Sequence, residues 1–109
     1  LGRNWRQSPA MPALRAMLAA TDPDGWMGVA AAVAGSDFYA ATATLTLPTL
    51  AIAGALDAAT PPDMVREMED LIRGSSFHLL RDAGHLPPAD QPGPFADALV
   101  SFLTAIGHR

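Results

Sequence analysis

Two residues of this chain, Asp57 and His85, have the types and positions needed for acid–base chemistry. Asp57 follows the apolar run 47–54, and His85 follows the apolar run 76–80. A buried carboxylate can hold an imidazole in one tautomer, and that imidazole can take a proton from a hydroxyl nucleophile and return it to a leaving group. We therefore predict that Asp57 and His85 are two members of a Ser-His-Asp triad.

The third member, the nucleophile, is not recognisable in the sequence. A serine on a sharp turn between a strand and a helix lies in a Gly-x-Ser-x-Gly segment. Five serines are present, none of them flanked in this way: Ser8, Ser36, Ser75, Ser76 and Ser101. The absence of Cys also removes thiolate nucleophiles, disulfides and Cys-ligated metals. We expect the nucleophile to come from outside this chain.

The two apolar runs predict neighbouring strands. Runs 47–54 and 76–80 are short, and Pro and Gly bound the first of them, which is typical of a buried parallel strand. Strands that alternate with helices indicate α/β architecture, and functional groups collect at the carboxyl ends of parallel strands. The sequence therefore predicts that Asp57 and His85 share one end of a parallel sheet.

Helices are predicted after each of these strands. The first begins with Thr60 as its N-cap and Pro61 in its first turn, and it ends at Gly74. The second is an amphipathic helix that opens near Pro92 or Pro94 and runs to the C-terminal region. Together they give the order strand, helix, strand, helix.

Two further helices are predicted before the first strand, over 9–20 and 22–35, with Asp22 as the N-cap of the second. No strand separates them, and the sequence changes character after the second helix. We therefore expect two units, a helical one over 1–37 and a sheet-bearing one over 38–109.

Two strands are too few for a stable open parallel sheet, since such sheets are buried on both faces. Yet half of the 109 residues are apolar and 17% are charged, so the chain has the composition of a core-forming protein. It also begins at Leu1 and not at Met. We expect it to be the C-terminal part of a larger fold.

Composition narrows the partners and the location. The net charge of −4 argues against nucleic acids and anionic membranes. No apolar stretch reaches the ~18–20 residues of a membrane span, and no signal peptide is visible. We expect a cytoplasmic protein.

A calcium-binding loop is not predicted. Asp22 and Asp24 are too few for such a loop and are better explained by helix capping.

Three segments resemble α/β-hydrolases, and among these the 3-oxoadipate enol-lactonases. Residues 48–62, PTLAIAGALDAATPP, are similar to the strand and loop that carry the family's triad acid. Residues 82–86, DAGHL, followed by DQP at 90–92, resemble the loop of its triad histidine, with Asp90 where Glu is usual. Residues 21–26, TDPDGW, resemble a stretch late in the family's helical cap.

The resemblance implies the C-terminal portion of an α/β-hydrolase fold, with the end of the cap over 1–37 and the end of the core over 38–109. It implies Asp57 as the triad acid and His85 as the base. It also implies Trp26 as a substrate-binding residue, although helical spacing alone would place Trp26 in a helix core. The serine and the oxyanion hole would come from the missing N-terminal half. No metal or organic cofactor is implied.

The activity implied is hydrolysis of 3-oxoadipate enol-lactone to 3-oxoadipate in bacterial breakdown of aromatic compounds, a reaction that this chain alone should not perform. Three alternatives stay open. The substrate could be another ester or the target of a non-haem peroxidase-like enzyme. The chain could be a non-catalytic interaction module or a degenerate hydrolase half. It could also pair with a separate N-terminal chain through its open sheet edge.

Overall fold

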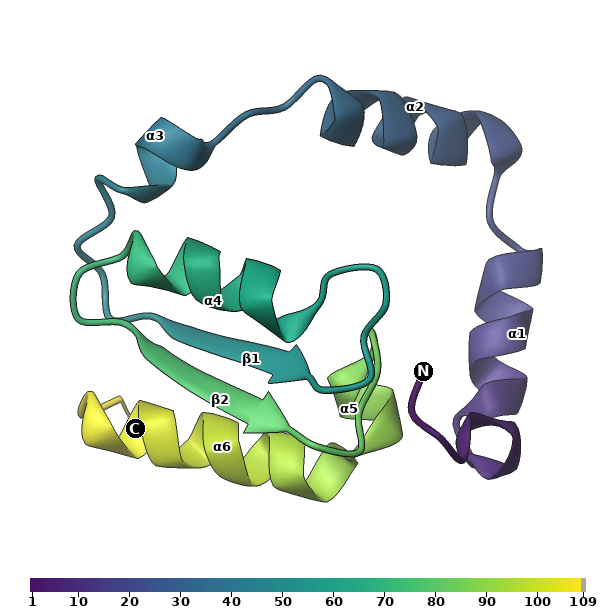
Figure 1. The fold of residues 1–109 in the computed structure, drawn as a ribbon. Coiled ribbons are helices and arrows are strands. Elements are labelled where there is room, and N and C mark those ends of the chain that lie inside the picture. The colour runs from purple at the N-terminus through teal and green to yellow at the C-terminus, as the bar shows by residue number, and fades with distance from the viewer. Residues whose placement is uncertain (109) are drawn as a thin grey trace.

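The computed structural model describes residues 1–108 (Figure 1). Its elements, in chain order, are the 3₁₀ helix η1 (Trp5–Gln7), α1 (Met11–Ala19), α2 (Pro23–Ala34), α3 (Tyr39–Thr42), β1 (Leu50–Gly54), α4 (Pro62–Asp70), β2 (Ser76–Leu80), α5 (Pro87–Asp90) and α6 (Pro92–Ala105). The predicted α/β architecture is confirmed. None of the helices in residues 1–108 combines the length and apolar character needed to cross a bilayer.

Strands β1 and β2 pair in parallel and start and end together, because Leu50 lies opposite Ser76 and Gly54 lies opposite Leu80. Helix α4 connects them and covers one face of the pair, and α6 runs along the other face (Figure 1). The register brings the two carboxyl ends to the same level. The loops that follow the strands therefore start side by side.

The hydrophobic core is thin. Its buried apolar side chains are small or medium in size: Ala51, Ala53, Ile72, Leu80 and Ala83. Phe77 in β2 packs against the guanidinium group of Arg66 in α4. The Cζ atom of Arg66 lies 4.0 Å from the centre of the Phe77 ring. In residues 1–108 the sheet has two strands, as the sequence predicted.

The N-terminal helices extend around the sheet, and no residue of α1 or α2 is buried (Figure 1). The predicted start of α2 is confirmed: the Asp22 carboxylate accepts hydrogen bonds from the backbone N–H groups of Asp24 (3.3 Å) and Gly25 (3.2 Å). These bonds satisfy N–H groups that have no partner within the helix.

The predicted start of the helix between the strands is wrong. Helix α4 begins at Pro62 with Pro61 as its N-cap, and no side chain caps it. Thr60 does not cap the helix, because its hydroxyl donates to the Asp57 carboxylate. The helix also ends at Asp70, earlier than the predicted stop at Gly74. The short helices α3 and α5 were not predicted, since four residues are too few to show a helical period.

Gly54 permits the close approach of the two loops that follow the strands. A Cβ atom at this position would overlap the backbone carbonyl oxygens of Ala83 and Gly84. At Gly28 in α2, by contrast, a Cβ atom would have no neighbour within 4 Å apart from the adjacent residues and the backbone of its own helix. The fold therefore requires glycine at position 54 for steric reasons, but it does not require glycine at position 28.

We expect Gly54→Ala to lower the free energy of unfolding by about 1–3 kcal/mol, because the backbone at 83–84 must move. Gly28→Ala is the matched control and should raise it by about 0.5–1 kcal/mol, since Ala favours a helix interior. Urea unfolding followed by circular dichroism measures both. An unchanged midpoint for Gly54→Ala would contradict the steric argument.

Candidate functional site

The loops after β1 and β2 are joined by backbone hydrogen bonds. The N–H of Ala55 donates to the carbonyl of Leu80 (2.9 Å), and the N–H of Leu56 donates to the carbonyl of Ala83 (2.9 Å). These bonds continue the strand pairing beyond the ends of the strands. They hold the segment that carries Asp57 against the segment that carries His85.

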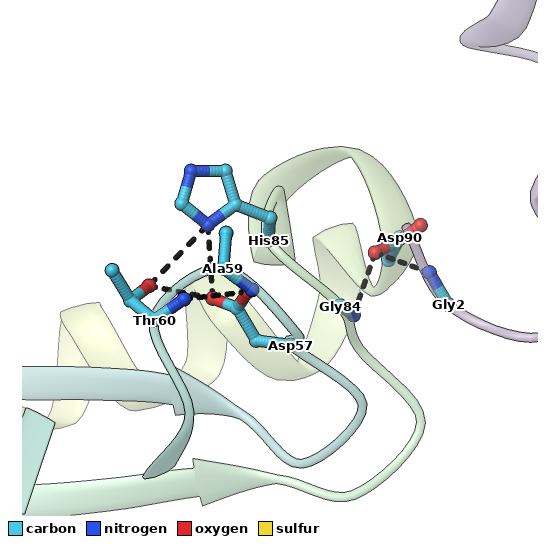
Figure 2. A network of polar contacts seen from close by, with 7 residues as sticks. All are labelled: Gly2, Asp57, Ala59, Thr60, Gly84, His85 and Asp90. Carbon is cyan, nitrogen blue, oxygen red and sulfur yellow. Dashed lines mark hydrogen bonds and ion pairs between the residues drawn. The ribbon is translucent and has the colours of Figure 1, made fainter. Parts of the chain in front are cut away.

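The structure brings Asp57 and His85 together at this end of the sheet (Figure 2). Nδ1 of His85 lies 2.9 Å from Oδ2 of Asp57. The Asp57 side chain is 6% exposed, whereas that of His85 is 54% exposed. Nδ1 of the ring faces the carboxylate, and the second ring nitrogen points away from it (Figure 2).

The Asp57 carboxylate accepts three further hydrogen bonds. Its Oδ1 accepts from the backbone N–H groups of Ala59 (2.8 Å) and Thr60 (3.1 Å). Its Oδ2 accepts from the Thr60 hydroxyl (2.7 Å). Burial by itself raises the pKa of Asp57, but the hydrogen bonds from His85, Thr60 and Ala59 outweigh it and hold the pKa well below the ordinary value of 3.8. Asp57 is therefore a carboxylate across the neutral range.

This ionisation fixes the tautomer of His85. An ionised carboxylate can only accept a hydrogen bond, so Nδ1 of the neutral imidazole carries the hydrogen. Nε2 is then left as a free acceptor on the exposed side of the ring. A group in this state can take a proton from a hydroxyl that approaches from solvent.

Asp90 holds the loop that precedes His85. Its Oδ2 accepts hydrogen bonds from the backbone N–H groups of Gly84 (2.8 Å) and Gly2 (2.7 Å) (Figure 2). The first of these bonds fixes the peptide next to His85, and the second ties the N-terminal segment to the same carboxylate. Asp90 thus positions the loop before His85. The proteins that this loop resembles usually have Glu at the corresponding position.

The structure does not bring Trp26 to the Asp57–His85 pair. Trp26 lies on α2, which is well separated from the carboxyl ends of the strands, and its side chain is 62% exposed (Figure 1). Its role in substrate binding stays a prediction. Within residues 1–108, no serine hydroxyl is hydrogen-bonded to His85, and no group of three or more His, Cys, Asp or Glu side chains could hold a metal ion.

Sequence reasoning missed the part that Thr60 plays. A threonine before two prolines matches a helix N-cap, and that pattern concealed the alternative acceptor three residues upstream. The signal was the spacing Asp-x-x-Thr, in which a carboxylate can accept from the backbone and the hydroxyl of the same turn.

Two curated proteins are similar in sequence. The chain is 32% identical to 3-oxoadipate enol-lactonase 1 of Acinetobacter baylyi over 89 residues, which is 82% of this chain and 33% of that protein. It is 38% identical to the (R)-3-hydroxydecanoyl-ACP:CoA transacylase of Pseudomonas aeruginosa over 64 residues, which is 56% of this chain and 21% of that protein. The chain therefore spans a third or less of the length of these relatives. No protein-family model matches it.

Solved structures agree with these relatives. A hydrolase from Pseudomonas aeruginosa superposes with a TM-score of 0.83 at 38% identity, covering 90% of this chain and 37% of that one. The enol-lactonase from Burkholderia xenovorans gives a TM-score of 0.78 at 29% identity, covering 85% and 37%. A thermophilic esterase from Thermogutta terrifontis gives 0.63 at 36% identity, covering 64% and 26%.

We expect Asp57→Asn to lower stability most at neutral pH. The pKa of Asp57 is lower in the folded chain than its ordinary value of 3.8, so the stabilisation from its ionised form is complete above that value and is lost as the pH falls further. The difference in unfolding free energy between wild type and Asp57→Asn should therefore be largest near pH 7 and shrink below about pH 4.

Urea unfolding at pH 7, 5, 4 and 3 measures this difference. Asp97→Asn is the control, because Asp97 is an exposed carboxylate on α6. Its effect should be small at every pH. A gap for Asp57→Asn that stays constant down to pH 3 would show that the ionised carboxylate does not stabilise the fold.

Proposed function

Because the chain belongs to the α/β-hydrolases and matches the C-terminal part of that fold, we propose that Asp57 and His85 are the acid and the base of a serine-type hydrolase site. The observation that carries the proposal is the 2.9 Å contact between Asp57 Oδ2 and His85 Nδ1 at the ends of two adjacent parallel strands. The nucleophilic serine and the oxyanion hole belong to a segment outside this chain.

In the proposed reaction, the serine hydroxyl approaches Nε2 of His85. The imidazole takes the hydroxyl proton as the oxygen attacks the substrate carbonyl, and it later gives that proton to the leaving oxygen. Asp57 stabilises the imidazolium and keeps Nδ1 protonated, so that Nε2 is the nitrogen that reacts. The 54% exposure of the His85 side chain leaves room for this approach.

The substrate we propose is 3-oxoadipate enol-lactone, which would be hydrolysed to 3-oxoadipate in bacterial breakdown of aromatic compounds. The support is the similarity to an enol-lactonase in both comparisons, in each case over more than four fifths of this chain. We assign residues 1–37 to the end of a helical cap, with Trp26 at its substrate side, and 38–109 to the core. We place the protein in the cytoplasm.

A second candidate is acyl transfer or hydrolysis on another ester or thioester. The stretch of 38% identity with a transacylase favours it. Both candidates use the same acid and base, and they differ in the acyl group and in the acceptor that completes the reaction.

We expect the chain alone neither to hydrolyse the enol-lactone nor to react with a fluorophosphonate probe, since none of its described serines is paired with His85. The natural protein, purified through a tag on this chain together with its Gly-x-Ser-x-Gly segment, should do both. His85→Gln should lower kcat by about 10⁴–10⁶-fold, and Asp57→Asn by about 10⁴-fold.

The control is His78→Gln, an exposed histidine on β2. It should leave kcat unchanged, because His78 lies within the strand and away from the strand ends where the pair forms. Full activity or full probe labelling in His85→Gln would refute the assignment of the base.

The substrate is tested by comparing kcat/KM for 3-oxoadipate enol-lactone, short p-nitrophenyl esters and medium-chain acyl-CoA thioesters. We expect the lactone to be preferred by at least about tenfold, which corresponds to roughly 1.4 kcal/mol of transition-state binding. Turnover of the esters without the lactone would replace the lactonase proposal by an esterase. Transfer from the thioester to an added thiol would favour the acyltransferase.

A further inference from the structure

Thr60 makes contact with both members of the Asp57–His85 pair (Figure 2). Its Oγ1 lies 2.7 Å from Asp57 Oδ2 and 3.3 Å from His85 Nδ1. It is half-buried, and it lies in the loop between β1 and α4. No other hydroxyl in residues 1–108 is hydrogen-bonded to either member of the pair.

The hydroxyl has one hydrogen and two neighbours that could accept it. The shorter contact is to the carboxylate, which is the stronger acceptor, so the hydroxyl donates to Asp57 Oδ2. Nδ1–H of His85 also donates to Oδ2, and the lone pairs of the Thr60 oxygen then face that same hydrogen at longer range. Thr60 therefore leaves Nδ1–H in an environment made only of acceptors.

Thr60 also holds both oxygens of the Asp57 carboxylate. Its backbone N–H donates to Oδ1 at 3.1 Å, and its hydroxyl donates to Oδ2 at 2.7 Å. Two donors from one residue fix the rotation of the carboxylate about its Cβ–Cγ bond. Without the hydroxyl, the remaining loop donors, the N–H groups of Ala59 and Thr60, both act on Oδ1, and Oδ2 is held by His85 alone.

We propose that Thr60 is a positioning residue for the proton-transfer step: its hydroxyl orients the Asp57 carboxylate so that His85 keeps its hydrogen on Nδ1 and presents Nε2. The proposal rests on the function proposed above, and it extends the site to a third side chain. Thr60 acts through Asp57 and is not itself required to touch the substrate.

The first test is the tautomer of His85, measured at pH 8.5 by two-bond ¹H–¹⁵N correlation NMR in the natural protein with its nucleophile-bearing segment. Comparison with His85→Gln identifies the signals of His85. The wild type should show the Nδ1–H form. Thr60→Val, which keeps the shape and removes the hydroxyl, should show a mixture of tautomers, and Thr60→Ser should restore the Nδ1–H form.

The second test is turnover by the natural protein with its nucleophile-bearing segment. Thr60→Val should lower kcat about tenfold with KM unchanged, as expected for loss of one hydrogen bond to a charged group. Thr60→Ser should recover most of it. Thr104→Val is the matched control, because the Thr104 hydroxyl donates to a backbone carbonyl within α6 and not to the site.

The outcomes separate the two proposals. An unchanged tautomer population in Thr60→Val, or equal losses in Thr60→Val and Thr60→Ser, would overturn the positioning role. Retained activity in His85→Gln would overturn the proposed function, while the tautomer measurement would still decide whether Thr60 orients the pair.

Discussion

The buried charge of Asp57 constrains the architecture of this site. A carboxylate that is almost fully shielded from water needs several donors, because an unpaired buried charge is costly. Three of its four hydrogen bonds come from Ala59 and Thr60, which lie within three residues of it. The turn after β1 is thus shaped around the charge. It leaves one direction open on Oδ2, and His85 occupies that direction.

Backbone geometry, together with one side chain, Asp90, brings His85 to that direction. The parallel register ends both strands at one level, and two backbone hydrogen bonds carry the pairing into the loops. Gly54 allows the second loop to come into contact, and Asp90 holds the N–H of Gly84 just before the histidine. These contacts fix the Cα of His85, and the hydrogen bond between its Nδ1 and the Asp57 carboxylate then fixes its ring.

This division explains which features could be predicted from the sequence. The nearness of Asp57 and His85 follows from apolar runs and from the geometry of parallel strands, both of which are visible in sequence. The capping of α2 by Asp22 is equally local, and the structure shows it as predicted.

The features that sequence analysis missed depend on which of several possible hydrogen-bond partners a side chain selects. Thr60 could cap a helix or donate to a carboxylate, and residue preference alone favoured the cap. The structure decides otherwise because the carboxylate is charged and shielded, so a hydrogen bond to it is worth more than one to an exposed N–H group. The bond from Gly84 to Asp90 was also out of reach, since the short helix α5 that places Asp90 has no periodic signal.

Many apolar side chains of this chain are exposed to solvent, but the polar contacts of the Asp57–His85 pair are formed within the chain. Large apolar side chains such as Trp26, Val33 and Val100 are more than 60% exposed, whereas the Asp57 carboxylate accepts four hydrogen bonds. The acid–base pair is therefore assembled by contacts within two loops and does not need a nucleophile to hold it. Nδ1 of His85 faces the Asp57 carboxylate, and the other ring nitrogen points away from it (Figure 2). A serine that reaches Nε2 would meet a base whose tautomer is already set, so the cost of ordering the base is met before the nucleophile arrives.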